Sequence, residues 1–326
     1  ELITDIFRSS VKSYKSLPQM LYHIQWKFRD EVRPRFGIMR CREFFMKDAY
    51  SFDLNEQDAK KSYNKMFYSY IKTFSRLGLK AIPMAADTGP IGGDLSHEFI
   101  ILAETGESQI YADKRIFEID LGKYKYNNES LSQMRRDFAN IYSATDEKYN
   151  EIKFNETVEK KNQIKTKGIE VGHIFYFSDK YSKPMNCMID DKSGKKISVK
   201  MGSYGIGVSR LVGAVIEANY NNDVMKWPKI ISPYDVVIIV SINKNNKDNF
   251  KKAEKIYQEL KKQNIDVLLD DVDENMSNKF KKHDLIGIPY QIIIGSKSEG
   301  DRFEFKELNS ESAILSLEDI KSKFKN

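Results

Sequence analysis

Two short arginine-rich segments, residues 28–31 and 40–44, carry side chains that suit a nucleotide site. Arg29 and Arg40 offer cations for phosphate groups, where negative charge builds up when a nucleophile attacks phosphorus. Phe44 offers a flat apolar face for a purine, and Glu31 an acceptor for the amino group of the base. The spacing alone leaves a second interpretation equally open, an exposed hairpin with interleaved surface charges.

A glycine-rich segment precedes a predicted helix further along the chain. Gly202, Gly205 and Gly207 suit either a phosphate-binding loop or the close packing of a strand on a helix. Arg210 lies one turn into that helix, and a guanidinium can bind a phosphate through two hydrogen bonds. An ordinary surface arginine is the alternative.

The histidines and cysteines give weaker signals. A lone histidine such as His97, between polar neighbours, is more often a hydrogen-bonded structural residue than a catalytic one. Cys41, His97 and His173 lack the spacing of a zinc site, so we predict no metal held by the protein alone. No serine or cysteine nucleophile pattern is present either.

The elements that position these residues follow from periodicity. Two aromatic-rich runs, residues 22–31 and 40–50, predict antiparallel strands, because Pro34 and Gly37 interrupt the link between them. Asn55 predicts the start of a helix that Gly78 ends. The run 208–219 predicts another helix, and residues 4–22 also have roughly helical spacing.

Prolines near residues 228 and 233 mark a boundary, beyond which the pattern changes. Strands and helices then alternate, which indicates a small α/β domain. The predicted strands are residues 236–241, 265–269 and 290–294, and the predicted helices are residues 246–262 and 278–286. We therefore expect one domain over residues 1–228 and a second over residues 233–326.

Composition limits the class of protein. The 326 residues are 40% hydrophobic and 31% charged, with a formal net charge of +6. We therefore expect a soluble globular protein without membrane contact. Two cysteines at unrelated positions indicate a reducing cytoplasm. The lysines that crowd the last hundred residues predict a solvated helical face, with an RNA-binding surface as the alternative.

Long segments resemble one enzyme family. Residues 28–52 resemble motif 2 of bacterial-type prolyl-tRNA synthetases, and residues 202–211 resemble motif 3 of the same class II family. Further matches follow in the family's order, at residues 87–89, 92–93, 96–99, 170–175 and 180–182. Residues 270–289 are similar to the family's anticodon-binding domain. The resemblance covers nearly the whole chain.

The resemblance implies a fold and a reaction. The fold is an α+β catalytic domain, an antiparallel sheet flanked by helices, followed by the α/β anticodon-binding domain. ATP, with Mg2+, activates L-proline to prolyl-adenylate, and the proline is then transferred to tRNA(Pro). Catalytic roles fall on Arg29 and Arg210. ATP-binding roles fall on Arg29, Glu31, Arg40, Phe44, Gly205, Gly207 and Arg210.

Further roles are implied for the two specificity regions. Proline binding falls on Phe45, His97, Ser203 and Gly205, and the anticodon region contains Asp271, Asp273, Glu274 and Lys279. Val272 and residues 275–277 depart from the family's Arg and Arg-Pro-Gly, which leaves the mode of anticodon reading open. The stretch between Phe99 and Glu170 is too short for the family's large editing insertion.

The first residue falls inside the family pattern. Motif 1, a main part of the family's dimer interface, and a Pro-Thr-x-Glu-Glu loop that contacts proline would precede Glu1. We therefore expect an N-terminally truncated chain whose full-length form is a homodimer. Two alternatives remain at this point, another class II synthetase such as a threonyl type and a non-catalytic relative that binds RNA.

Overall fold

The computed structural model describes residues 2–86, 95–221, 224–242 and 247–324. These residues fall into two compact units, Glu1–Ala218 (unit 1) and Asn219–Asn326 (unit 2). Length and polarity rule out a membrane-spanning role for each helix in the described segments.

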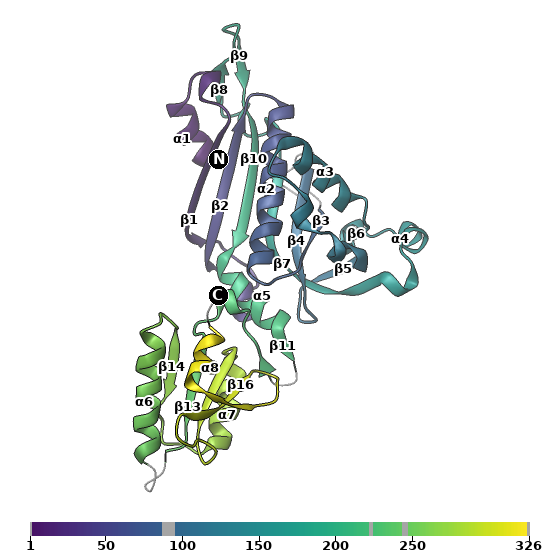
Figure 1. Ribbon diagram of the computed structural model, residues 1–326. Helices are drawn as coiled ribbons and strands as arrows, with labels where there is room; N and C mark the ends of the chain where they lie inside the picture. The colour runs from purple at the N-terminus through teal and green to yellow at the C-terminus, as the bar shows by residue number, and fades with distance from the viewer. Residues whose placement is uncertain (1, 87–94, 222–223, 243–246, 325–326) are drawn as a thin grey trace. The chain divides into compact units, whose positions relative to one another are not determined.

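Unit 1 is built around a sheet of eight strands among its described residues, in the order β1-β2-β10-β7-β4-β3-β6-β5 (Figure 1). All of its neighbouring strands are antiparallel except β3 and β6. The strands are β1 Gln19–Phe28, β2 Glu43–Asp53, β3 Ala81–Ala85, β4 Leu95–Leu102, β5 Ser108–Asp113, β6 Ser143–Thr145, β7 Gln163–Tyr176 and β10 Lys200–Gly207, with a separate hairpin of β8 Met188–Asp190 and β9 Lys196–Ser198.

One face of this sheet is covered by α2, Glu56–Arg76. The Asn55 side chain caps the helix as predicted, because its Oδ1 accepts from the Asp58 N–H at 2.9 Å. The buried face of α2 carries Tyr63, Phe67 and Phe74, which confirms that these aromatic residues belong to the core. The other helices of unit 1 are α1 Leu2–Ser10, α3 Asn128–Ala139, α4 Glu151–Thr157 and α5 Val208–Asn219, which ends at the boundary between the units.

Unit 2 contains a five-stranded sheet in the order β14-β13-β15-β16-β17. Its first three strands in that order are parallel, and the other two are antiparallel. The strands are β13 Val236–Val240, β14 Val267–Asp270, β15 Tyr290–Ile294, β16 Arg302–Glu307 and β17 Ala313–Ser316, and the helices are α6 Lys247–Lys261, α7 Met276–Ile286 and α8 Leu317–Ser322. A short hairpin of β11 Tyr220–Asn221 and β12 Val224–Met225 precedes them.

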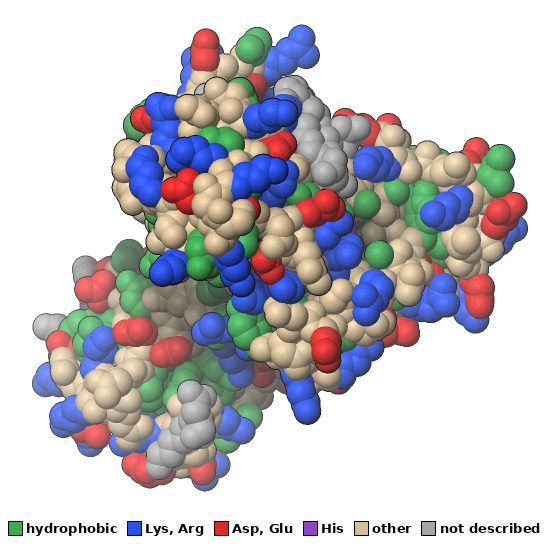
Figure 2. Space-filling view, turned by 90° about the horizontal axis from the view of Figure 1, so that it is seen from above, with side chains coloured by type: hydrophobic (Ala, Val, Ile, Leu, Met, Phe, Trp, Pro, Cys, Tyr) green, Lys and Arg blue, Asp and Glu red, His purple; other side chains and the backbone are tan. Residues whose placement is uncertain are grey.

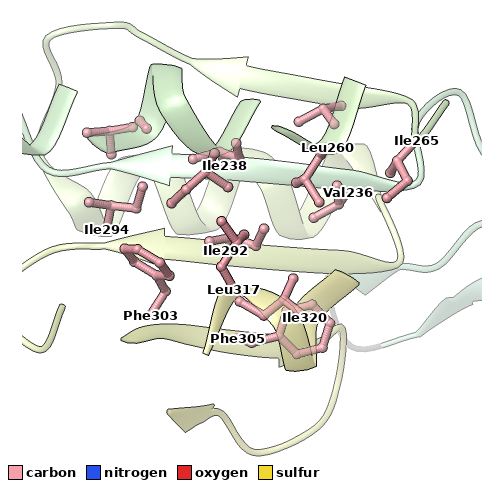
Figure 3. Close-up of a cluster of buried hydrophobic side chains, with 14 residues drawn as sticks. Val236, Ile238, Leu260, Ile265, Ile292, Ile294, Phe303, Phe305, Leu317 and Ile320 are labelled. Atoms are coloured by element: carbon pink, nitrogen blue, oxygen red, sulfur yellow. The ribbon is translucent and has the colours of Figure 1, made fainter. Parts of the chain in front are cut away.

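Every residue of β13 is buried, because helices cover both faces of this sheet. Figure 3 shows one side, where Val236 and Ile238 pack with Leu260 of α6 and Ile320 of α8. On the other side, the intervening residues of β13 pack against α7. The α+β unit 1 and α/β unit 2 together confirm the predicted fold class.

The division between the units lies ten residues before the sequence-based boundary at residue 228. The segment around Trp227 belongs to unit 2, because the Trp227 N–H donates to the Gly287 carbonyl at 3.1 Å and its Nε1 donates to the Ile286 carbonyl at 2.9 Å. The proline signals therefore mark a turn inside unit 2. On the visible surface, Lys and Arg side chains are interspersed with Asp and Glu (Figure 2).

Candidate active site

A cavity of about 790 Å³ opens in unit 1, a volume typical of small-molecule sites. Gly172 faces Tyr70 and Phe74 of α2, so the next residue of β7, His173, points to the opposite face of the sheet, where the cavity lies. The lining includes eight residues predicted from the sequence: Arg29, Glu31, Arg40, Phe44, Phe45, Gly205, Gly207 and Arg210.

The hairpin of β1 and β2 positions the first group of these residues. β1 ends at Phe28, earlier than predicted, and β2 begins at Glu43, later than predicted, so the link between them holds Arg29, Glu31 and Arg40. The prediction that those three residues lie on strands is therefore wrong. Pro34 has no N–H to donate to a ladder, and Gly37 has a left-handed φ of 57°, so the link turns instead of extending.

Arg29 is nevertheless held in place. Its N–H donates to the Arg42 carbonyl at 2.9 Å, and its guanidinium carbon lies 5.0 Å from the centre of the Phe44 ring. A cation at this distance from an aromatic face is attracted by the electrons of the ring. The predicted phosphate contact and the predicted purine contact are therefore neighbours.

Glu31 and Arg40 form an ion pair at the cavity wall. The Arg40 Nε lies 3.0 Å from Glu31 Oε2, and the Arg40 Nη1 lies 3.2 Å from Glu107 Oε2. The Arg33 N–H donates to Glu31 and, together with Arg40, keeps the pKa of the Glu31 carboxyl below its usual value. A phosphate entering the cavity would compete with two carboxylates for Arg40.

The junction of β10 and α5 supplies the second wall. A Cβ on Gly205 would lie 2.7 Å from Cε of Met46, the far end of a flexible side chain, so these two residues of β10 and β2 are close neighbours in the cavity wall. Arg210 projects from the first turn of α5. Its Nε donates to the Met39 carbonyl and its Nη1 to the Glu170 carbonyl, each at 2.9 Å.

A group that sequence reasoning missed lies deeper on the same face. Glu98, Glu170 and His173 bring three possible metal-ligand atoms within 4.8 Å of one another, the one such group within the described ranges. The His173 Nδ1 lies 3.2 Å from Glu170 Oε1, and its Nε2 lies 2.6 Å from the Ser96 hydroxyl. The sequence pattern that could have predicted this group is the alternation of side chains along β4, which places Ser96 and Glu98 on one face.

Electrostatics distinguish the two carboxyls of this group. Burial and the charge of Glu170 raise the pKa of Glu98 to about 7. Burial also opposes ionisation of Glu170, but its hydrogen bond with His173 and the charges of His173, Arg210 and Arg29 together outweigh that cost and lower its pKa. One carboxyl of the pair is therefore readily protonated near neutral pH while the other stays ionised.

The predicted proline-binding residues divide into three groups. Phe45 and Gly205 line the large cavity, and Ser203 lines a smaller one of about 180 Å³ beside Tyr50. The predicted place of His97 in the proline pocket needs correction. Strand alternation turns its side chain toward α2, where its Nδ1 lies 2.6 Å from the Tyr63 hydroxyl. Burial and the charge of Arg135 lower the pKa of His97 to about 3. The matching segment at residues 87–94 lies outside the described residues.

Comparisons with known proteins identify the two units. Residues 1–219 match the model of the tRNA synthetase class II core domain (G, H, P, S and T), and residues 236–326 match the anticodon binding domain. The chain is 61% identical over 322 residues to the proline–tRNA ligase of Pelagibacter ubique, covering 98% of this chain and 72% of that protein. It is 51% identical over 298 residues to the proline–tRNA ligase of Parvibaculum lavamentivorans, covering 91% and 68%.

The chain belongs to the proline–tRNA ligase family. Identities at this level confirm the predicted family and favour proline over the threonyl alternative. The chain spans about 70% of the length of these relatives.

Solved structures with this fold include other prolyl-tRNA synthetases. The Giardia lamblia enzyme in complex with prolyl-adenylate has a TM-score of 0.70 at 16% identity, and the match covers 98% of this chain and 55% of that one. The Cryptosporidium parvum enzyme complexed with L-proline and AMP has a TM-score of 0.69 at 15% identity, with 99% and 55% covered. At these identities the likeness supports the fold alone.

The anticodon region predicted for this proline–tRNA ligase chain lies between β14 and α7. Asp271 and Asp273 are exposed and Glu274 is half-buried, so these three side chains are accessible to a partner. The predicted place of Lys279 in the RNA-binding region needs correction, because its side chain is fully buried inside unit 2. A lysine on the inner face of α7 has no access to RNA.

Proposed function

We propose that the protein activates L-proline with ATP and transfers it to tRNA(Pro). The observation that carries this proposal is the arrangement of Arg29, Phe44 and Arg210 around one cavity. These side chains come from two distant segments, and they match the needs of a bound nucleotide: cations for phosphates and an apolar face for the base. The membership of the family supports the proline and tRNA specificity.

The first step is attack of the proline carboxylate on the α-phosphorus of ATP. The new C–O–P linkage gives prolyl-adenylate, and pyrophosphate leaves. Arg29 neutralises the charge that grows on the α-phosphate. Phe44 stacks on the adenine, and Glu31 accepts from its amino group once Arg40 turns to the phosphates. Arg40 and Arg210 bind the β- and γ-phosphates.

Mg2+ enters this proposal as the companion of ATP, where it would neutralise charge on the phosphate oxygens. The carboxylates of Glu98 and Glu170 fit such an ion, because Mg2+ prefers oxygen ligands. His173 fits it less well. Its hydrogen bonds to Glu170 and Ser96 are better suited to orienting the Glu170 carboxylate.

The second step is attack of the terminal ribose hydroxyl of tRNA on the adenylate carbonyl, which forms the ester and releases AMP. Unit 2 binds the anticodon end of the tRNA through the loop of residues 271–275. The cytoplasm, where tRNA is charged, is the proposed location.

The protein is proposed to act as a homodimer. β1 is an edge strand, and alternate residues along it are exposed on one face: Met20, Tyr22, Ile24, Trp26 and Phe28, from 39% to 74%. A contiguous apolar row of this kind on an edge strand is a typical interface. Sedimentation of the intact protein and of an Ile24→Lys variant tests it, with a dimer that becomes a monomer as the expected result.

Pyrophosphate exchange tests the activation step. The intact protein is incubated with ATP, labelled pyrophosphate and proline, threonine or alanine in turn. We expect exchange that depends on proline. Equal exchange with the three amino acids would remove the proline assignment, and exchange without transfer to tRNA(Pro) would restrict the function to amino-acid activation.

A further inference from the structure

Unit 2 contains a buried ionic cluster where β14 ends. Lys279 of α7 is fully buried, and its Nζ donates to the Val240 carbonyl at 2.9 Å and to the Asp270 carbonyl at 3.1 Å. The same ammonium lies 3.3 Å from the Asp270 carboxylate. A single lysine therefore ties α7 to the last residues of two neighbouring strands, β13 and β14.

The Asp270 carboxylate has further partners. The Lys282 Nζ lies 2.9 Å from Asp270 Oδ2, and the His283 Nε2 donates to the same oxygen at 2.6 Å. Burial alone would raise the pKa of Asp270, but hydrogen bonds from Lys282 and His283 outweigh it and hold the pKa at about 2. Burial lowers the pKa of His283, so its ring is neutral at neutral pH and contributes one N–H.

The remaining hydrogen bond of this carboxylate goes to the loop that leaves the sheet. The Val272 N–H donates to Asp270 Oδ1 at 3.2 Å, and the Glu274 N–H donates to the Val272 carbonyl at 3.0 Å. Asn275 then caps α7 by accepting from the Asn278 N–H at 2.9 Å. The loop of residues 271–275 is thus fixed at both ends and at its centre.

A stable core does not require such a cluster. Burying the Asp270 carboxylate and the Lys279 ammonium costs desolvation free energy, and well-packed apolar residues at such positions are often as stabilising. The charged groups instead fix the orientation of the side chains, since each hydrogen bond depends on an angle as well as a distance. In this cluster those directions converge on the one carboxylate from which the exposed loop begins.

We propose that Asp270 is a positioning residue for tRNA recognition, which holds the loop of residues 271–275 in the conformation that contacts the anticodon. Lys279, Lys282 and His283 act through Asp270 by fixing its carboxylate. The inference rests on the proposed function for the identity of the RNA. It gives the buried Lys279 a role inside the domain in place of the direct RNA contact expected from the sequence.

The test compares tRNA binding with proline activation in the intact protein. In Asp270→Asn, the uncharged amide no longer pairs with two ammonium groups. We expect tRNA(Pro) to bind at least about tenfold more weakly, the effect of losing one charge-assisted hydrogen bond. Proline-dependent pyrophosphate exchange should stay within about twofold, because activation takes place in unit 1 and needs no tRNA.

A second pair of variants covers the case in which Asp270→Asn unfolds unit 2. Val272→Pro removes the N–H that reaches Asp270 and also fixes the φ of residue 272, whereas Val272→Ala keeps the N–H, and the Val272 side chain is 51% exposed. We expect weaker tRNA binding for the proline variant alone. Unchanged binding in Val272→Pro, or equal losses in the two Val272 variants, would overturn the inference. Lack of proline-dependent exchange in the unchanged protein would count against the proposed function, and the binding comparison would still decide the inference.

Discussion

The Arg40 guanidinium and the Glu31 carboxylate face each other at 3.0 Å across the cavity wall. Both residues are predicted to bind the nucleotide, one through phosphates and one through the base. In the structure they satisfy each other, which keeps a charged site ordered without a ligand. Under the proposed function, binding of ATP would exchange this ion pair for two separate contacts, Arg40 with a phosphate and Glu31 with the base.

This exchange predicts the effect of removing Arg40. Arg40→Ala should raise the KM for ATP roughly tenfold or more, because a charge-assisted contact to phosphate is lost. Arg35→Ala is the matched control, since Arg35 also pairs with Glu107, at 2.9 Å, but is half-exposed and does not line the cavity. Pyrophosphate exchange at varied ATP concentrations measures both. Equal KM values for the two variants would contradict the assignment of Arg40.

Arg29 is expected to act in the transition state instead. Arg29→Ala should slow single-turnover formation of prolyl-adenylate by on the order of 3 kcal/mol in the barrier, roughly a hundredfold. Arg33→Ala serves as the control, because its backbone N–H to Glu31 survives the change and its side chain is exposed. An unchanged rate in Arg29→Ala would show that the α-phosphate lies elsewhere.

Much of the fold was predictable because local signals agreed with the tertiary structure. The helix at residues 208–219 and the strand at residues 290–294 have the predicted bounds, and the Asn55 cap starts α2. The helical spacing at residues 4–22 predicted too long a helix, because α1 ends at Ser10 and β1 starts at Gln19. Only residues 19–22 of that stretch belong to the strand, which is too few for their alternation to be distinguished from helical spacing.

Individual site residues were harder to predict, because a motif gives a position in the chain and not a direction. His97 and Glu98 are adjacent in a segment that matches the family, yet only Glu98 faces the site, and strand parity decides which. The prediction that Lys279 belongs to the RNA-binding region was wrong for a related reason. The helix face that it occupies depends on the packing of α7 against β13, which the lysine-rich sequence of this region conceals.

The correction at His97 gives a prediction that separates the two histidines. His97→Ala should destabilise unit 1 by about 2 kcal/mol, because it leaves the buried Tyr63 hydroxyl without its partner, while the KM for proline stays nearly unchanged. His173→Ala, on the cavity face, should instead raise the KM for ATP roughly fivefold or more, because the Glu170 carboxylate loses the partner that orients it, with a smaller loss of stability. Urea unfolding and exchange kinetics on both variants measure these effects, and the reverse pattern would restore His97 to the site.

The burial of His97 should also make the free energy of unfolding depend on pH in the acid range. Its pKa is about 3 in the folded protein and near 6.5 when unfolded, so the unfolded chain takes up a proton that the folded chain excludes. The stability that this residue contributes is therefore present above about pH 6.5 and is lost as the pH falls toward 3. Unfolding of His97→Gln and of the unchanged protein at pH 7 and pH 5 measures the difference. A gap in stability that stays constant between those values would mean that His97 titrates normally.

Lys47 makes the same kind of contribution at alkaline pH. It lies on the α2 face of β2, where its Nζ donates to the Tyr70 hydroxyl at 3.0 Å and to the Tyr204 carbonyl at 3.4 Å. Burial lowers the pKa of this ammonium to about 8, while the charge of Asp48 opposes the shift. The usual value of 10.5 applies in the unfolded chain.

Between pH 8 and pH 10.5 the unfolded chain therefore holds a proton that folded Lys47 has lost, so this residue's contribution to stability rises with pH. Lys47→Met carries no titrating group there. Relative to that variant, the unchanged protein should gain on the order of 2 kcal/mol of unfolding free energy from pH 7.5 to pH 10. Lys47→Arg is the control, since its guanidinium stays charged and its difference from Lys47→Met should not change. Urea unfolding at both pH values makes the comparison, in which the other lysines and tyrosines cancel. A constant difference between the unchanged protein and Lys47→Met would place this ammonium in water instead of beneath the sheet.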